Sequence, residues 1–214
     1  MLQTATVKES TYNLLKELMA DSVFSKFSLV GGTSIALRMG YRKSIDLDLF
    51  TQDDFDVAEI NDYLVKKYGF IERFRSGKTL KGDIKGVFVD FIKYPYPLVK
   101  PIEKNEDIRL FSLEDVSAMK LSAITDNGSR LKDFVDIAYL SFKFSLNEML
   151  RFYEEKFCDS NILSVLKSLG YYDDIDFEGE PIELLSGNFS WEKVKNRIDS
   201  MISNPDKRFK DFPI

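Results

Sequence analysis

The sequence predicts an α+β fold, in which a mixed sheet flanked by helices occupies the N-terminal half and a helical region follows. Segments with strand-like apolar patterns occur before about residue 105. Segments with helical apolar spacing and capping residues fill the rest of the chain. Pro95, Pro97 and Pro101 separate the two parts. We therefore expect a first domain over residues 1–104 and a second, helical domain over residues 105–214.

Helices and strands alternate in the predicted N-terminal half. Helices are expected where apolar residues recur at helical spacing, and Gly40 and Gly69 are the expected ends of two of them. Strands are expected where apolar residues alternate with polar ones or form a short run. The predicted helices span residues 11–24, 33–39 and 55–68. The predicted strands span residues 27–30, 45–50, 70–76, 79–85 and 87–94.

After Pro101 the chain is expected to be mostly helical. Ser112 precedes an acidic first turn with Glu114 and Asp115, which is typical of a helix start. Ser145 and Glu148 have the spacing of a capping box. The predicted helices begin near residue 112 and span residues 129–142, 145–157, 160–169 and 190–203.

The composition excludes several kinds of catalytic site. Because the chain has no histidine, it can form neither a Ser-His-Asp nor a Cys-His catalytic site, nor a zinc site with histidine ligands. Its single cysteine excludes a zinc site with several cysteine ligands and an intramolecular disulfide. The single cysteine fits a reducing cytosol, so we expect a cytoplasmic protein. Carboxylates without histidine favour a hard cation such as Mg²⁺. The net charge of −5 argues against a dedicated DNA-binding protein, and no apolar run is long enough to predict a membrane partner.

A diglycine joins a predicted strand to a predicted helix. Gly31 and Gly32, followed by Thr33 and Ser34, would let backbone N–H groups approach a phosphate at the helix N-terminus. Taken alone, two glycines before a helix more often mark only a tight turn.

Three aspartates lie in predicted strands. Asp46 and Asp48 are two residues apart, so both carboxylates face one side, and a shared divalent cation would relieve their repulsion. Asp90 is a lone acid in an apolar strand and must be paired, protonated, exposed or metal-bound. Three such carboxylates on neighbouring strands could hold two Mg²⁺ ions for phosphoryl transfer. The alternatives are an exposed edge strand for Asp46 and Asp48, and a lysine partner for Asp90.

These motifs together resemble a known family. The diglycine, the Asp46-x-Asp48 pair and the later strand aspartate are similar to the pattern of the DNA polymerase β-like nucleotidyltransferases. The wider segment 27–50 resembles the AbiEii/AbiGii-type nucleotidyltransferases, which are the toxin halves of bacterial abortive-infection and toxin–antitoxin pairs. Asp115 with Lys120, and the segment 130–136, resemble the later motifs of that family.

The resemblance implies transfer of a nucleoside monophosphate from an NTP to an acceptor hydroxyl, with Mg²⁺ or Mn²⁺ as cofactor. It implies an RNA acceptor, such as the 3′ end of tRNA, and a cognate antitoxin as a protein partner. The implied metal ligands are Asp46, Asp48 and Asp90. Lys120 would contact the phosphates, and Asp133 or Asp136 would complete the active site. The residues implied to lie along the nucleotide are Gly31, Gly32, Thr33, Ser34, Lys43 and Ser44.

Plainer interpretations stay open beside the resemblance. Asp115 could act only on the helix dipole, Lys120 could be a surface lysine, and the aspartates of segment 130–136 could pair with nearby basic residues. Between residues 72 and 104 the chain has eight Lys and Arg but only four Asp and Glu. This local positive charge could bind a nucleic-acid backbone, or it could belong to a solvated hairpin. Two other functions are a small-molecule nucleotidyltransferase and a fold that binds a nucleotide or a partner without turnover.

Overall fold

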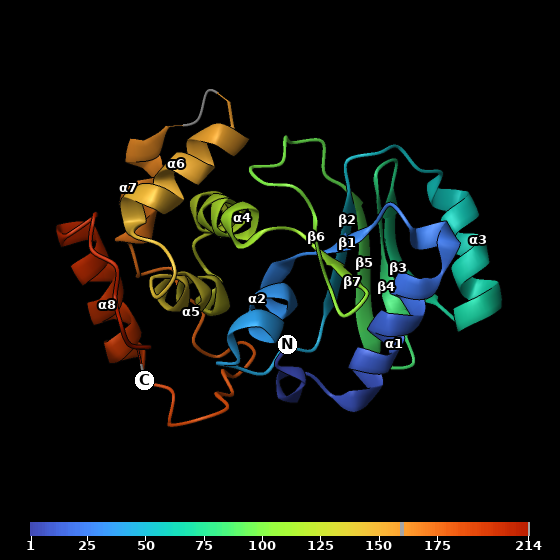
Figure 1. The fold of residues 1–214 in the computed structure, drawn as a ribbon, viewed down its shortest axis with the longest axis horizontal. Coiled ribbons are helices and arrows are strands. Elements are labelled where there is room, and N and C mark those ends of the chain that lie inside the picture. The colour runs from blue at the N-terminus through green and yellow to red at the C-terminus, as the bar shows by residue number, and fades with distance from the viewer. Residues whose placement is uncertain (159–160, 214) are drawn as a thin grey trace. The chain divides into compact units, whose positions relative to one another are not determined.

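The computed structural model describes residues 1–158 and 161–213, and the chain divides into two compact units (Figure 1). The first unit comprises residues 1–40, 44–97 and 101–111. The second unit comprises residues 41–43, residues 98–100 and the chain from Ser112 onward. Two short segments from the N-terminal half thus belong to the second, helical unit.

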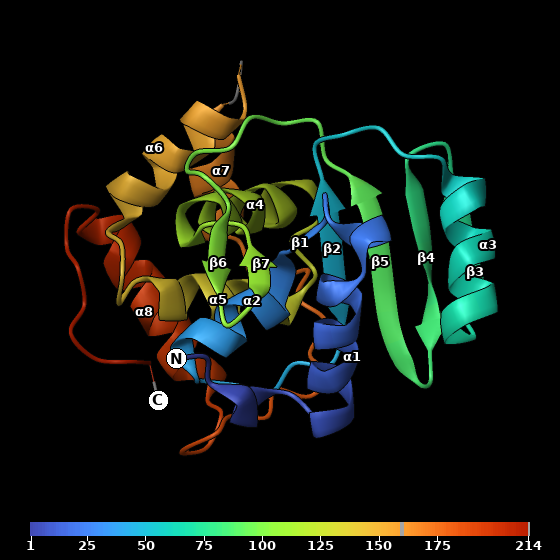
Figure 2. The same cartoon turned by 45° about the vertical axis from the view of Figure 1, so that its right-hand side comes forward.

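A mixed sheet forms the centre of the first unit (Figure 2). Its strands are β1 (Ser28–Leu29), β2 (Leu47–Thr51), β3 (Ile71–Ser76), β4 (Thr79–Ile84), β5 (Val87–Lys93), β6 (Glu103–Asn105) and β7 (Ile108–Leu110). Their order in the sheet is β3-β4-β5-β2-β1-β7-β6. Strand β2 is parallel to β5 and β1 is parallel to β7, whereas the other neighbours are antiparallel. This sheet, followed by helices, confirms the predicted α+β class.

The helices of the first unit are α1 (Glu9–Ala20), α2 (Gly31–Met39) and α3 (Val57–Tyr68), with short 3-10 turns η1 (Thr4–Thr6) and η2 (Ser22–Phe24). Helices α1 and α3 lie on the same side of the sheet (Figure 1). Asp56 caps α3 by accepting hydrogen bonds from two backbone N–H groups, and Gly69 ends it in the left-handed conformation, as predicted.

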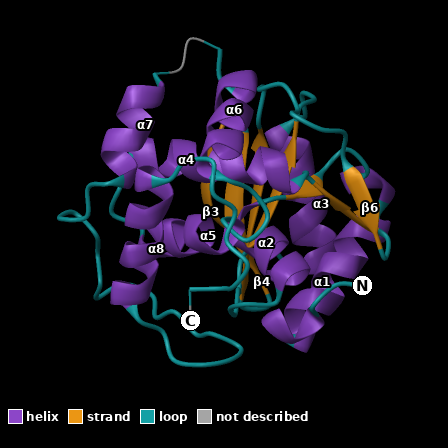
Figure 3. Cartoon of the chain, turned by 60° about the vertical axis from the view of Figure 1, so that its left-hand side comes forward, coloured by secondary structure: helices purple, strands orange, loops and turns teal. Residues whose placement is uncertain are grey.

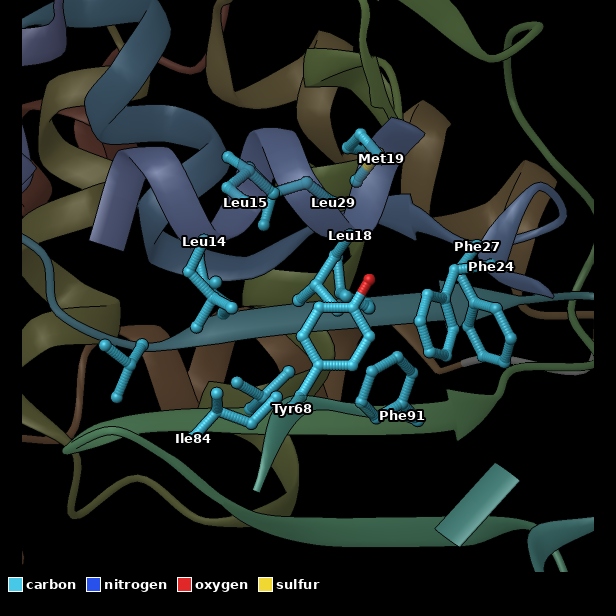
Figure 4. Packing of buried hydrophobic residues seen from close by; sticks show 14 of the residues in the cluster. Leu14, Leu15, Leu18, Met19, Phe24, Phe27, Leu29, Tyr68, Ile84 and Phe91 are labelled. Atoms are coloured by element: carbon cyan, nitrogen blue, oxygen red, sulfur yellow. The ribbon is translucent and has the colours of Figure 1, made fainter. Parts of the chain in front are cut away.

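One face of the sheet packs on α1 and α3 to form the core (Figure 4). Leu47, Leu49 and Phe91 are buried there, and the ring of Phe91 lies 5.1 Å from that of Phe24, centroid to centroid. Side chains alternate between the two faces of a strand, so Asp48, between Leu47 and Leu49, lies on the opposite face. The alternation predicted from the sequence is confirmed over β2.

The second unit consists of helices and their connections (Figure 3). Its helices are α4 (Leu113–Asp126), α5 (Leu131–Leu140), α6 (Leu146–Lys156), α7 (Ile162–Leu169) and α8 (Trp191–Ser203). The capping box of Ser145 and Glu148 is confirmed, as is the start of α4 after Ser112. The predicted start of the fourth helix at residue 160 lies outside the described residues. Within the described residues, no helix is long and apolar enough to cross a bilayer.

The sequence predicts helical structure after Pro101, and this prediction is wrong for residues 103–110. These residues form β6 and β7, which a turn with positive φ at Glu106 and Asp107 connects. Strands of three residues are too short to show a period of two, and only the buried Ile108 and Leu110 mark the apolar face. The first unit accordingly includes both of these strands and extends to Phe111.

Asp21 links α1 to α3 within the first unit. Its Oδ2 accepts hydrogen bonds from the Tyr63 hydroxyl at 2.9 Å, the Tyr68 hydroxyl at 2.7 Å and the Lys67 Nζ at 2.7 Å. Burial alone would raise the pKa of Asp21, but these bonds and one from the Val23 N–H lower it from 3.8 to about 2.

Because the pKa of Asp21 is lowered by folding, its ionisation stabilises the fold above about pH 4, and this contribution disappears as the pH falls toward 2. We expect Asp21→Asn to lower the free energy of unfolding by about 1–2 kcal/mol at pH 7. Urea unfolding of wild type and variant at pH 7, 4 and 2.5 checks this. The difference in free energy of unfolding between wild type and variant should shrink below pH 4. A difference that stays constant to pH 2.5 would contradict the stabilising role of the ionised Asp21 carboxylate.

Candidate functional site

The diglycine and the Asp48 carboxylate are in direct contact. Helix α2 starts at Gly31, whose φ of +67° favours glycine. A Cβ built at Gly31 would lie 2.9 Å from Cγ of Asp48 and closer still to its Oδ2. Position 31 therefore requires glycine for two reasons: its φ is positive, and the Asp48 carboxylate occupies the space that a Cβ would need.

Thr33 fixes the loop that leads into β2. Its hydroxyl donates to the backbone oxygen of Asp46 and lies 2.8 Å from Oγ of Ser44. The side chains of Thr33 and Ser34 are buried, and Ser34 Oγ accepts a hydrogen bond from Arg38. Their hydroxyls thus serve the structure, and their backbone N–H groups at the start of α2 are what they offer to an anion.

A row of charged residues crosses the sheet on the face opposite the core. Asp48 on β2 is in register with Asp90 on β5, and Asp90 is in register with Lys81 on β4. Lys81 Nζ donates to Oδ2 of Asp90 at 2.5 Å, so the lysine partner considered for Asp90 is present. Within the described residues, no group of three or more His, Cys, Asp or Glu could hold a metal ion. The Asp90 carboxylate is thus already paired with the Lys81 ammonium. A role of Asp90 as a metal ligand stays a prediction.

Asp48 lies on β2, whereas Asp46 lies in the loop just before it and not in the strand predicted for residues 45–50. The side-chain chemistry of both residues fits Mg²⁺. They present carboxylate oxygens, which are the donors that Mg²⁺ prefers, and Asp48 lies at the start of α2. In nucleotide sites Mg²⁺ is commonly held by one or two carboxylates, while substrate phosphates and water complete the octahedron. A third protein carboxylate is therefore not required.

The second unit buries Lys120 between two aspartates. Its Nζ, on α4, lies 2.5 Å from Oδ1 of Asp133 and 2.8 Å from Oδ2 of Asp136, both on α5. The two acids are three residues apart and face the same side of the helix. Lys120 is 8% exposed, so its interpretation as a surface lysine is wrong. Arg130, one of the nearby basic residues, lies 3.7 Å from Asp133, whereas Lys132 pairs with Glu180.

Arg42 completes this group, and the sequence analysis missed it. Its Nε and Nη2 donate to the two oxygens of Asp136 at 2.7 and 3.0 Å, and the Tyr41 hydroxyl donates to the same carboxylate. Arg42 is 2% exposed. Its position in the sequence, a few residues before Asp46, could have indicated a role for Arg42. The resemblance assigned the basic residue of this stretch to Lys43 instead. The backbone N–H of Lys43 donates to the oxygen of Glu183, and the phosphate contact expected of its side chain stays a prediction.

The buried charges of this group sustain each other. Burial acts to lower the pKa of Lys120, but the carboxylates of Asp133 and Asp136 raise it overall. Burial likewise acts to raise the pKa of Asp136, but Arg42 and Lys120 hold it below its ordinary value. Asp136 therefore stays ionised across the neutral range, and a carboxylate so strongly stabilised as an anion is a poor proton acceptor.

Asp115 is a second buried acid with a similar task. Its Oδ1 accepts from Lys156 Nζ at 2.6 Å and from the Val99 N–H at 3.0 Å. Its Oδ2 accepts from the Lys100 N–H at 3.1 Å and from Ser112 Oγ at 2.6 Å. Asp115 therefore does more than stabilise the dipole of α4, because it also fastens residues 98–100 to that helix.

Comparison with known proteins identifies the family. The sequence profile of the family described as "Nucleotidyl transferase AbiEii toxin, Type IV TA system" matches residues 13–100 and 83–212. The chain belongs to this AbiEii family. The resemblance inferred from the motifs is thereby confirmed, and the chain is a nucleotidyltransferase.

A relative and two solved structures agree with this membership. An uncharacterized protein of Aquifex aeolicus (strain VF5) is 31% identical over 209 residues, which cover 92% of this chain and 98% of that one. A Helicobacter pylori protein described as a candidate nucleotidyltransferase has a TM-score of 0.56 at 16% identity, covering 93% of this chain and 96% of its own. JHP933 of H. pylori gives the same TM-score and identity over 94% of this chain and 93% of its own. At this identity, the two structures support the shared fold alone.

Gly31→Ala tests the contact between the diglycine and Asp48 in this AbiEii-family chain. We expect it to lower the free energy of unfolding by about 2–4 kcal/mol, because it adds an overlap with Asp48 to the strain of a positive φ. Gly69→Ala is the matched control, since Gly69 has a φ of +68° and nothing within 4 Å of a built Cβ. That control should lose only about 1 kcal/mol. Equal losses in urea unfolding would count against the contact.

Lys156→Met tests the buried pair with Asp115. Removing the cation leaves Asp115 buried with its charge uncompensated, and we expect a loss of about 3–5 kcal/mol in the free energy of unfolding. Lys81→Met is the control, because Lys81 is 43% exposed at its side chain and its pair with Asp90 should contribute less than about 1 kcal/mol. Chemical denaturation compares the stability of the two variants. Similar losses in Lys156→Met and Lys81→Met would refute the stabilising role of the buried Lys156–Asp115 pair.

Proposed function

We propose that this chain transfers a nucleoside monophosphate from an NTP to an acceptor hydroxyl with release of pyrophosphate, and that Asp46 and Asp48 bind Mg²⁺ or Mn²⁺. The contact of the Asp48 carboxylate with the first residue of α2 supports the proposal. It brings a cation ligand and the amides of a helix N-terminus together, which is the combination that a metal-bound triphosphate needs.

The residues around this contact have distinct proposed roles. The backbone amides from Gly31 to Ser34 would bind the triphosphate, and Ser44, hydrogen-bonded to Thr33, would orient the loop before Asp46. A bound Mg²⁺ would neutralise phosphate charge and stabilise the entering and leaving oxygens. The acceptor hydroxyl would give its proton to a carboxylate of the site or to solvent, and its oxygen would bond to the α-phosphorus as the bond from that phosphorus to the leaving pyrophosphate breaks.

The second unit contributes Lys120 and Asp133 to the proposal. Lys120 would contact the nucleotide phosphates, as the family resemblance implies. Of the two aspartates on α5, Asp133 is the better candidate to meet the substrate, because Asp136 already accepts from Arg42, Tyr41 and Lys120. Lys43 is retained as a further phosphate contact on the same grounds of resemblance.

We propose an RNA acceptor, and within this class the 3′ end of tRNA. The support is local charge, since the strands around β3 to β5 are rich in Lys and Arg although the chain is acidic overall. Arg73 also lies over the Phe88 ring at 4.8 Å, which forms a flat cationic surface on which bases could stack. The type IV toxin–antitoxin description of the family supports a cognate antitoxin as the protein partner.

Asp46→Asn and Asp48→Asn test the proposed metal ligands. With labelled NTPs, Mg²⁺ and total tRNA, each variant should transfer label at least about a hundredfold more slowly than wild type, because charge stabilisation in the transition state is lost. Thermal melting of each variant checks that it stays folded, so that the loss of transfer is a loss of chemistry. Asp83→Asn, on β4 of the same sheet, is the control and should keep its activity.

Parallel reactions with DNA and with an aminoglycoside distinguish the acceptor classes. Transfer to tRNA alone supports the RNA assignment, and transfer to the aminoglycoside alone replaces it with a small-molecule acceptor. Absence of transfer with every NTP, or equal transfer by Asp46→Asn and wild type, overturns the proposed function.

A further inference from the structure

The carboxylate of Asp136 is shared among three donors, and Arg42 takes both of its oxygens. The guanidinium binds side-on through Nε and Nη2, at 2.7 and 3.0 Å, in the two-pronged geometry that makes arginine–carboxylate pairs strong and directional. Lys120 Nζ approaches Oδ2 of the same group at 2.8 Å and Oδ1 of Asp133 at 2.5 Å. Lys120 thus lies between one carboxylate that is already paired and one that is much less so.

We propose that Arg42 is a positioning residue, which holds the Lys120 ammonium beside Asp133 by occupying the carboxylate of Asp136. The inference rests on the proposed function, in which Lys120 contacts the nucleotide phosphates. Arg42 and Lys120 balance Asp133 and Asp136, so the buried group has no net charge. Without Arg42 the group has a net charge of −1, Lys120 moves toward Asp136, and a phosphate meets a repulsive site.

Arg42 is itself held in place along its whole length. Its backbone forms an antiparallel bridge to Leu184, and its Nη1 donates to the oxygen of Lys43 at 2.9 Å. The N–H of Leu185 donates to the oxygen of Tyr41, whose ring stacks on Tyr139 with centroids 4.3 Å apart. A side chain fixed at both ends loses little further entropy when it orders its partner, which is what a positioning role requires.

Two groups of the second unit provide internal controls. Lys156 is fully buried and pairs with Asp115, whose other partners are Ser112 and the backbone N–H groups of Val99 and Lys100. Arg197 is a largely buried arginine whose guanidinium pairs with Asp211 and Ser141. Loss of Arg197 therefore imitates the loss of a buried arginine without touching Asp136.

The experiment follows the Nζ signals of Lys120 and Lys156 by ¹H–¹⁵N NMR in the full chain, because an ammonium held by carboxylates exchanges its protons slowly. In Arg42→Met we expect the Lys120 signal to disappear, or its exchange to rise at least about tenfold, while the Lys156 signal is unchanged. Arg42→Lys keeps the charge but not the two-pronged bond, so the Lys120 protons should exchange at a rate between those of wild type and Arg42→Met. Arg197→Met should leave both signals in place.

Nucleotide kinetics give the second readout. Arg42→Met should raise the KM for the NTP at least about tenfold with kcat changed less than about threefold, Arg42→Lys should recover part of the loss, and Arg197→Met should match wild type. An unchanged Lys120 signal in a folded Arg42 variant overturns the positioning role. Where Arg42→Met loses both lysine signals through unfolding, the Arg42→Lys signal decides in the same way. If wild type turns over no NTP, the proposed function fails, while the Lys120 signal still decides the role of Arg42.

Discussion

A carboxylate removed from water must be paired, and two fully buried acids of the helical unit find their partners far away in the sequence. Asp115 on α4 accepts from the backbone N–H groups of Val99 and Lys100, and Asp136 on α5 binds the side chains of Tyr41 and Arg42. Breaking a buried pair of this kind costs about 3–5 kcal/mol, which is a large share of the stability of a domain. The course of both segments is therefore fixed by charge rather than by packing alone. This explains why three residues after α2 belong to the helical unit while the residues on either side belong to the sheet.

The sheet unit separates stability from chemistry by means of strand alternation. Leu47 and Leu49 point into the core shared with α1 and α3, and Asp48 between them points away from it. The apolar face contributes the burial that stabilises the strand, so the opposite face can carry like charges that would otherwise weaken the pairing of β2 with β5. Gly31 completes the arrangement, because only a residue without a Cβ lets the Asp48 carboxylate rest on the first turn of α2.

Local signals predicted most of this architecture. Alternation revealed β2 and β5, the Ser145–Glu148 capping box revealed α6, and the diglycine with the Asp46–Asp48 spacing revealed the contact at the start of α2. The pairing of Asp90 with Lys81 could be anticipated as an alternative, since the two residues are nine apart on adjacent strands. Strands β6 and β7 escaped because three residues show no period. Arg42 and the burial of Lys120 escaped for another reason: their partners are 94 and 13 or more residues away, and a charged residue in sequence looks like a surface residue until its partner is known.

The presence of an arginine next to two acids and a lysine resolves an apparent conflict in the proposed role of Lys120. A lysine that binds phosphate must be protonated and fixed, and two adjacent carboxylates achieve both. The same two carboxylates would repel the phosphate, however, because together they outweigh one ammonium. Arg42 removes this repulsion by pairing with Asp136, whose pKa it helps to hold below its ordinary value, so that Lys120 stays fixed while the local charge is balanced. A neutral residue at position 42 would let Lys120 move toward Asp136, where it is less firmly held and poorly placed to attract an anion. A lysine there could supply the charge without the two parallel bonds that define the position of Asp136.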